Sequence, residues 1–243
     1  MKILPWAGDS IFPALCETLL AWRKSAPDTR DLPWRDEPTP YHVWISEIML
    51  QQTRAAVVRG YYLRFLDALP TVRDLAAVDD DALMKLWQGL GYYSRARNLK
   101  RAAQAIVTDH GGELPSDFDA LLALPGIGRY TASAITSFAY GEPRPAVDGN
   151  FLRVAARVTA NGIDIAKDTT KRALESALAP SYPGGRGAGL LNEAFMDLGA
   201  TVCLPNGTPL CHVCPAAQLC LAHEYGTEQD YPVKTALKAR RKE

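Results

Sequence analysis

The chain has 243 residues, of which 47% are hydrophobic and 22% charged, a globular composition with enough residues for one large or two modest domains. Lysine plus arginine equals aspartate plus glutamate at 27 each, which excludes an overall cationic character, so nucleic-acid binding would need a local patch or helix dipoles. The first residues, MKILPWAGDS, lack a long apolar core, and no apolar run is long enough for a membrane span, so we expect an intracellular protein.

Helical patterns dominate and strand alternation is nearly absent, so we expect an all-α fold. The predicted helices span residues 10–24, 41–51, 54–68, 79–88, 93–110, 117–123, 129–140, 149–160, 168–179 and 188–200. Gly111 and Gly112 close the helix 93–110, and Ser116 begins the segment SDFD, which resembles a capping box. The segment 182–189 predicts a surface loop, and the basic segment PVKTALKARRKE predicts a linker or frayed end.

The segment VWISEIMLQQ, residues 43–52, carries one acidic residue, Glu47, in an almost wholly apolar run. At about 100° per residue, Val43 and Leu50 lie to one side of Glu47 on a helix and Trp44 lies to the other. This helix has no broad polar face, and a helix that is hydrophobic all round is a buried one. We therefore expect a buried carboxylate whose pKa is raised by burial, so that it can be protonated.

The segment GLGYYSRARNLKRA, residues 89–102, combines glycines and two tyrosines with four basic residues, Arg95, Arg97, Lys100 and Arg101. Basic residues beside aromatic ones suit contact with nucleic acid and stacking on bases. The alternative is a solvated helix face next to two core tyrosines.

The segment LPGIGRYTASAI, residues 124–135, lies between two predicted helices. Gly126 and Gly128 permit a tight turn with exposed N–H groups, and the following helix N-terminus adds positive potential. Together these could bind a phosphate without a basic side chain, which would let a neutral protein hold DNA. The alternative is an ordinary corner between two helices.

The segment PAVDGN, residues 145–150, places Asp148 directly before Gly149 and Asn150 at a helix start. Aspartate at this position is often an N-cap, but capping alone would not explain the buried Glu47. One buried carboxylate and one at a helix N-terminus are a plausible acid and anion pair for cleaving a glycosidic bond. We expect the helix dipole and N–H groups to keep Asp148 ionised.

Four of the five cysteines crowd into 18 residues: Cys203, Cys211, Cys214 and Cys220. Clustered cysteines in a protein without a secretion signal are more often metal ligands than disulfides. Structural zinc sites usually have two close pairs of ligands, whereas this segment has one, so the spacing favours a [4Fe–4S] cluster over zinc and over free thiols. Cys16, alone in an apolar helix, is expected to be a core residue.

Taken together, LPWR, TPYHVWISEIMLQQT, GLGYYSRARNL, LPGIGRYTA, VDGN and the cysteine cluster resemble the helix–hairpin–helix DNA glycosylases with an iron–sulfur cluster. Within that group the chain is most similar to the MutY family, adenine glycosylases that act on adenine opposite guanine or 8-oxoguanine. The resemblance implies an all-helical fold of two lobes. Residues 32–142 would form a six-helix barrel with the hairpin at 117–140, residues 1–31 with 143–226 the iron–sulfur lobe, and 227–243 a basic tail.

The resemblance also implies a role for each matching residue. Glu47 would protonate N7 of an adenine flipped out of the duplex and then activate water. Asp148 would stabilise the oxocarbenium-like state, and Asn150 and Tyr130 would orient the two carboxylates. The residues that match the adenine pocket are Arg30, Leu32, Trp34, Arg35 and Glu193. Gln52 and Tyr92 match residues that wedge into the base stack, whereas Gly126, Gly128 and Arg129 form the DNA-binding hairpin.

Two departures from the family pattern affect the expected DNA contacts. Seven residues, LPNGTPL, separate Cys203 from Cys211, where the family commonly has six, and none of them is basic. The family usually continues into a C-terminal domain that recognises 8-oxoguanine, which we expect this chain to lack. We expect a monomeric, monofunctional enzyme that binds double-stranded DNA with an A·8-oxoguanine or A·G mismatch, in the cytoplasm or on a bacterial nucleoid.

Three other functions compete with this interpretation. A glycosylase–lyase for oxidised pyrimidines would place a lysine after GVGR, where this chain has Tyr130. A thymine glycosylase for T·G mismatches can share the tyrosine, but Glu193 and LPWR favour adenine. A non-catalytic DNA-binding or electron-transfer iron–sulfur protein would not need both Glu47 and Asp148.

Overall fold

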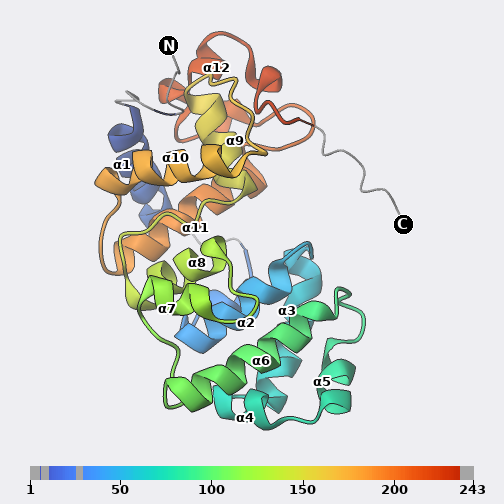
Figure 1. Cartoon of the computed structure of the whole chain (residues 1–243). Helices are drawn as coiled ribbons and strands as arrows, with labels where there is room; N and C mark the ends of the chain where they lie inside the picture. Colours follow the sequence, from blue (N-terminus) through green and yellow to red (C-terminus); the bar gives the residue numbers. More distant parts are fainter. Residues whose placement is uncertain (1–5, 7–10, 26–29, 236–243) are drawn as a thin grey trace. The chain divides into compact units, whose positions relative to one another are not determined.

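The computed structural model describes residue 6, residues 11–25 and residues 30–235 (Figure 1). Every regular element in these ranges is helical, so the expected all-α fold is confirmed. The chain divides into two compact units, one of residues 28–142 and the other of residues 1–27 with 143–243. Each unit has its own hydrophobic core. Within the described ranges, no helix is both long and apolar enough to cross a membrane.

The unit 28–142 is built from a short 3-10 helix, η1, and α-helices α2 to α8. Their bounds are η1 Pro33–Arg35, α2 Pro40–Leu50, α3 Ala55–Ala68, α4 Val72–Ala77, α5 Asp80–Trp87, α6 Ser94–Asp109, α7 Phe118–Ala123 and α8 Arg129–Tyr140. Helix α2 packs against α8 and α3, and α6 packs against α4 and α5 (Figure 1). Trp44 and Trp87 are among the largest fully buried side chains of this core.

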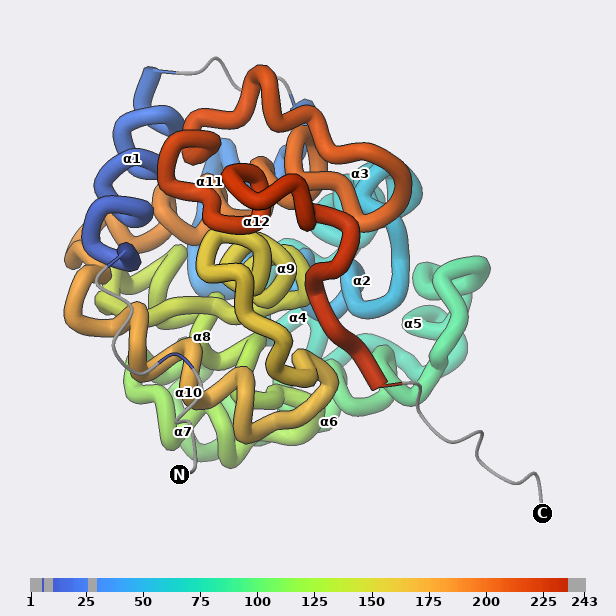
Figure 2. Tube along the Cα trace, turned by 90° about the horizontal axis from the view of Figure 1, so that it is seen from above, coloured from blue at the N-terminus to red at the C-terminus, as the bar shows by residue number. Residues whose placement is uncertain are grey.

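The second unit combines the N-terminal helix with the C-terminal half of the chain. Its elements are α1 Ile11–Ser25, α9 Gly149–Val158, α10 Asp168–Leu178, η2 Ala179–Ser181, α11 Arg186–Thr201, η3 Cys211–Val213, η4 Ala217–Leu219, α12 Leu221–Glu224 and η5 Glu228–Asp230. Helix α11 packs against α1 and α9, and α12 packs against α9 (Figure 2). Cys16 is buried in this core, as expected.

The ten predicted helices are all present, and their observed ends lie within about two residues of the predicted ones. The sequence pattern missed α4 and α12, since helices of six and four residues are too short to display a 3.6-residue period. The predicted capping box at Ser116 is wrong. Asp117 is the N-cap of α7, and its side chain accepts a hydrogen bond from the Ala120 N–H at 2.8 Å.

The segment expected to begin the basic tail is attached to the second unit as far as residue 235. The Val233 carbonyl accepts a hydrogen bond from the Ile165 N–H at 3.0 Å, and the Thr235 N–H donates to Asp164 at 3.1 Å. Backbone groups make these contacts, so the low apolar content of the segment did not reveal them. The rest of the expected tail, residues 236–243, lies outside the described residues.

Helix α3 offers a matched test of core packing. Phe65 is fully buried with its ring 6.1 Å from that of Trp87, whereas Leu63, two residues earlier, is 47% exposed. We expect Phe65→Ala to lower the free energy of unfolding by about 3–5 kcal/mol and Leu63→Ala by less than about 0.5 kcal/mol. Urea denaturation followed by circular dichroism measures both changes, and similar decreases in the two variants would contradict this packing.

Candidate functional site

Glu47 lies in the middle of helix α2 and is only 7% exposed. Helix α2 begins at Thr39, whose side chain accepts a hydrogen bond from the His42 N–H, and Pro40 occupies its first turn. Seven other residues of α2 are also buried, which confirms that this helix lacks a solvated face. Tyr130 is half-buried in the first turn of α8, the helix that packs against α2.

The hairpin predicted at 117–140 is formed by α7 and α8, which pack against each other around the turn 124–128. Gly126 has a left-handed φ of 78°, and a Cβ there would lie 2.8 Å from the Asn98 Cβ, so both conformation and space require glycine. The N-cap of α8 is Gly128, a residue with no side chain of its own to cap the helix. A helix N-terminus carries positive potential, which favours an anion such as a phosphate.

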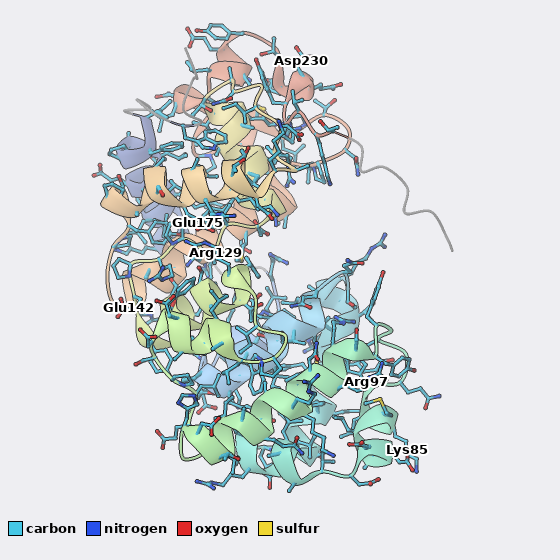
Figure 3. The ribbon with its side chains drawn as sticks, viewed as in Figure 1. Lys85, Arg97, Arg129, Glu142, Glu175 and Asp230 are labelled. Atoms are coloured by element: carbon cyan, nitrogen blue, oxygen red, sulfur yellow. The ribbon has the colours of Figure 1, made fainter. Side chains whose placement is uncertain are left out.

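Arg129 is exposed on the first turn of α8 (Figure 3). Its guanidinium lies 5.3 Å from the Phe118 ring centroid. This cation–π contact links the two helices of the hairpin across the turn. Arg129 therefore adds a positive side chain to the anion-binding end of α8.

Asp148 is the N-cap of α9 in the second unit, as its position predicted. One carboxylate oxygen accepts a hydrogen bond from the Phe151 N–H at 2.9 Å, and the other accepts from Asn150 Nδ2 at 2.7 Å. Burial raises the pKa of Asp148 and outweighs these bonds and the nearby Arg153, which lower it. The N–H groups at the helix N-terminus favour the ionised form, as expected from the sequence, but desolvation has the larger effect on the pKa.

The sequence pattern did not reveal Arg153, which connects Asp148 to the cysteine segment. Its Nη2 donates to Asn150 Oδ1 at 2.8 Å, and its Nε donates to the Cys203 carbonyl at 2.8 Å. Asn150 thus bonds to Asp148 through its amide nitrogen and to Arg153 through its oxygen. The arginine lies three residues after Asn150 on one helix, but its other partners lie about 50 residues away, so no local pattern could identify it.

The four clustered cysteines line one pocket in the second unit. The rest of its lining consists of Val154, Arg157, Val158, Leu198, Val202, Pro209, Ala216, Ala217, His223 and Glu228. Burial raises the pKa of Cys211 and of Cys214 to about 11 and also raises that of Cys220. Such thiols stay protonated at neutral pH until a metal displaces the proton.

A second set of possible metal ligands overlaps the cysteine pocket. Single ligand atoms of Cys211, His223 and Glu228 lie within 4.8 Å of one another, and His223 Nδ1 is 2.7 Å from Glu228 Oε1. Four thiols in one largely apolar pocket fit the ligand set of an iron–sulfur cube. The mixed set would suit zinc but would leave three of the four cysteines unused.

The residues expected around the adenine pocket belong to both units. Trp34 is buried in the core of unit 28–142 with its ring 5.6 Å from that of Tyr62. Leu32 packs against the same core, and Arg30 and Arg35 are half-buried.

Glu193 lies on α11 of the second unit, where it forms an ion pair with Arg23 at 2.7 Å. Arg23 Nε also lies 3.7 Å from Asp197 Oδ2. The sequence pattern missed Arg23, because 170 residues separate it from Glu193.

Gln52 and Tyr92 are both exposed and both have left-handed backbones, with φ values of 56° and 49°. Such values are uncommon for residues with side chains. The predicted basic surface around them is only partly confirmed. Arg97 and Arg101 are exposed, but Arg95 is 8% exposed and donates to protein carbonyls, so it does not face nucleic acid. Lys100 forms an ion pair with Asp80.

Comparison with known proteins places these features in a family. Residues 45–180 match the model of the HhH-GPD superfamily base excision DNA repair proteins. The chain is 42% identical to an adenine DNA glycosylase of Rattus norvegicus over 87% of this chain and 42% of that protein.

Two solved structures are also similar. A thermostable thymine-DNA glycosylase has a TM-score of 0.79 and 30% identity, with 88% of this chain and 97% of that chain covered. A non-covalent endonuclease III–DNA complex has a TM-score of 0.72 and 24% identity, with 88% and 95% covered. The second likeness concerns the fold alone.

The all-helical fold and the hairpin α7–α8 define a helix–hairpin–helix protein. The chain belongs to the HhH-GPD superfamily of base excision DNA repair proteins, whose model covers more than half of it. It spans less than half the length of the rat adenine DNA glycosylase that it resembles.

The raised pKa of Asp148 predicts how stability depends on pH. A carboxyl that binds its proton more tightly in the folded state loses stability as pH rises from the ordinary aspartate value through the raised value. Asp148→Asn removes this loss, so its melting temperature relative to the unchanged protein should increase as the pH rises above the ordinary aspartate pKa of about 4.

Asp164→Asn is the matched control. The Ala166 N–H lowers the pKa of Asp164, so its titration lies below this range and its melting-temperature difference should stay constant. Differential scanning calorimetry of both variants measures the effect. A difference for Asp148→Asn that does not vary with pH would show that Asp148 has no raised pKa.

Proposed function

We propose that the chain is a monofunctional DNA glycosylase that removes adenine mispaired with 8-oxoguanine or guanine from double-stranded DNA. The observation that carries this proposal is Glu47, a carboxylic acid buried in the core-facing helix of a base-excision-repair fold. A buried acid is the group such a reaction needs to protonate a leaving base. The 42% identity to the rat adenine DNA glycosylase supports adenine over other bases.

In the proposed reaction two carboxyl groups have separate roles. Glu47 protonates N7 of the extrahelical adenine, and the N-glycosidic bond breaks as positive charge develops on the sugar. Asp148, ionised and held by Phe151 and Asn150, stabilises that charge. Glu47 then removes a proton from the attacking water, and the product is an abasic site with the strand intact. Tyr130 offers no amine, so no Schiff base forms at its position.

We propose that phosphates bind at the hairpin and that the cysteines hold a cluster. The positive N-terminus of α8, Gly126 in its tight turn and the exposed Arg129 support a phosphate contact. The four cysteines would hold a [4Fe–4S] cluster. When bound, the cluster would supply four iron–thiolate bonds that cross-link Cys203, Cys211, Cys214 and Cys220 within one segment.

A panel of duplexes tests the proposed function. The duplexes carry A·8-oxoguanine, A·G, T·G and an oxidised pyrimidine opposite adenine, and base release and strand cleavage are measured separately. We expect adenine release from the first two, with strand breakage only after alkali treatment. Release of thymine alone would support the T·G alternative, to which the 30% identical thymine-DNA glycosylase fold lends weight. Direct strand cleavage would support a lyase.

Glu47→Gln tests the proposed acid. The amide keeps the shape of the side chain but cannot deliver a proton, so the single-turnover rate should fall by about 100- to 10,000-fold with mismatch binding largely retained. Glu113→Gln is the control, since Glu113 is an exposed glutamate of the same unit. A near-normal rate for Glu47→Gln would exclude Glu47 as the acid.

Metal analysis tests the cluster. Anaerobically purified protein should contain about four iron and four sulfide per chain, and Cys214→Ser should lose both. Cys16→Ala should retain both, because Cys16 is a core residue that does not line the cysteine pocket. Stoichiometric zinc without sulfide would instead support the mixed site of Cys211, His223 and Glu228.

A further inference from the structure

Arg95 joins two loops that lie far apart in the sequence. It is in the first turn of α6, and its guanidinium donates hydrogen bonds to six acceptors. These acceptors are the carbonyls of Ile48, Met49, Gln51, Leu90 and Gly91 and the Thr53 hydroxyl, at 2.7–3.4 Å. Nη1 donates to carbonyls at the C-terminal end of α2, and Nη2 donates mainly to carbonyls of the loop between α5 and α6. One planar group therefore holds both loops.

The bonds to Gln51 and Gly91 act directly on the two left-handed residues. The Gln51 carbonyl and the Gln52 N–H belong to one peptide plane, so fixing that carbonyl fixes the orientation of the plane that precedes Gln52. The Gly91 carbonyl has the same relation to Tyr92. A strained backbone persists only where its surroundings hold it, and Arg95 provides contacts of that kind at both positions.

The faces of the Arg95 guanidinium contact aromatic rings. Its Cζ lies 5.4 Å from the Trp87 ring centroid and 5.5 Å from the Tyr92 ring centroid. Trp87 is fully buried, whereas Tyr92 is 60% exposed. The arginine thus braces an exposed aromatic ring against the core. Among the described residues, Arg95 Nε has no acceptor, so the hydrogen bonds of the guanidinium come from its two Nη atoms.

We propose that Arg95 is a positioning residue that holds Gln52 and Tyr92 together as a rigid pair for insertion into the base stack of duplex DNA. The proposal rests on the proposed glycosylase function. Arg95 itself stays buried and contacts no phosphate. It lowers the cost of extruding the target base, because the backbone at neither position has to be ordered when DNA binds. Lysine cannot replace it, since an ammonium lacks the planar fork that reaches two loops at once.

Arg95→Lys is tested by single-turnover adenine release at saturating enzyme, at a temperature where circular dichroism shows the variant folded. The substrates are an A·G duplex and a duplex in which the target adenine faces an abasic site, so that it is already poorly stacked. We expect the rate to fall by about 10- to 100-fold on A·G and by less than about threefold on the second duplex. Equal decreases on both duplexes would mean that Arg95 only maintains the fold, and the proposal would fail.

A mutant cycle gives an independent readout. In a Gln52→Ala/Tyr92→Ala background there is no inserted pair to position, so Arg95→Lys should cause little further decrease in rate. If Arg95→Lys lowered the rate by the same factor in this background as in the unchanged protein, the proposal would be overturned.

Arg97→Ala is the matched control on the same helix, two residues later and exposed. An exposed arginine that binds a phosphate displaces counterions, so Arg97→Ala should reduce the salt dependence of DNA binding. Arg95→Lys should leave that dependence unchanged. A reduced salt dependence for Arg95→Lys would show that Arg95 contacts phosphate, contrary to the proposal.

Two further results separate the possible failures. If the unchanged protein releases no adenine from either duplex, the proposed function fails, and the positioning role fails with it. If the protein is active but Arg95→Lys does not fold, NMR of the unchanged protein measures how fast the Arg95 side-chain protons exchange. The Arg95 Nη protons should exchange slowly with solvent and those of Arg97 rapidly, whereas rapid exchange at Arg95 would overturn the proposal.

Discussion

A guanidinium stays charged at every physiological pH, so each arginine that this fold buries must be surrounded by acceptors. Arg95, Arg153 and Arg157 are all less than a tenth exposed, and all three bond to backbone carbonyls from segments distant in sequence. Those carbonyls lie at helix ends and in loops, where no helical ladder supplies their partners. The buried arginines therefore supply the hydrogen bonds that hold these loops and helix ends in place.

The two carboxyl groups of the proposed site are both buried, but their local surroundings differ. Glu47 lies within a helix that packs on all sides, whereas Asp148 is at a helix N-terminus with hydrogen bonds from Phe151 and Asn150. Those bonds lower the pKa of Asp148, but desolvation raises it by more. Ionisation of Asp148 therefore costs stability, and the reaction proposed above would depend on this ionised form.

Asn150 and Arg153 extend this support into the cysteine segment. Arg153 bonds to the carbonyls of Gly199 and Cys203, and Arg157 donates to the Cys203 thiol at 3.3 Å. Both arginines lie on α9, the helix that Asp148 caps. Order in the segment that carries the cysteines and order around Asp148 therefore depend on one helix. If the carbonyls of the cysteine segment moved away, the buried guanidinium groups of Arg153 and Arg157 would be left with unpaired donors.

The sequence by itself determined the helices, because apolar residues repeat with helical period over ten segments, and it singled out Glu47 as an acid in an apolar helix. It also grouped the cysteines, whose closeness along the chain brings them to one pocket. Only the tertiary structure decided what Arg95 contacts. The basic composition of residues 95–101 predicts a solvated patch, and it does not distinguish the buried Arg95 from the exposed Arg97 and Arg101. The same holds for Arg153 and Arg23. Their partners are distant in sequence, and burial and hydrogen-bond direction depend on how helices pack rather than on local pattern.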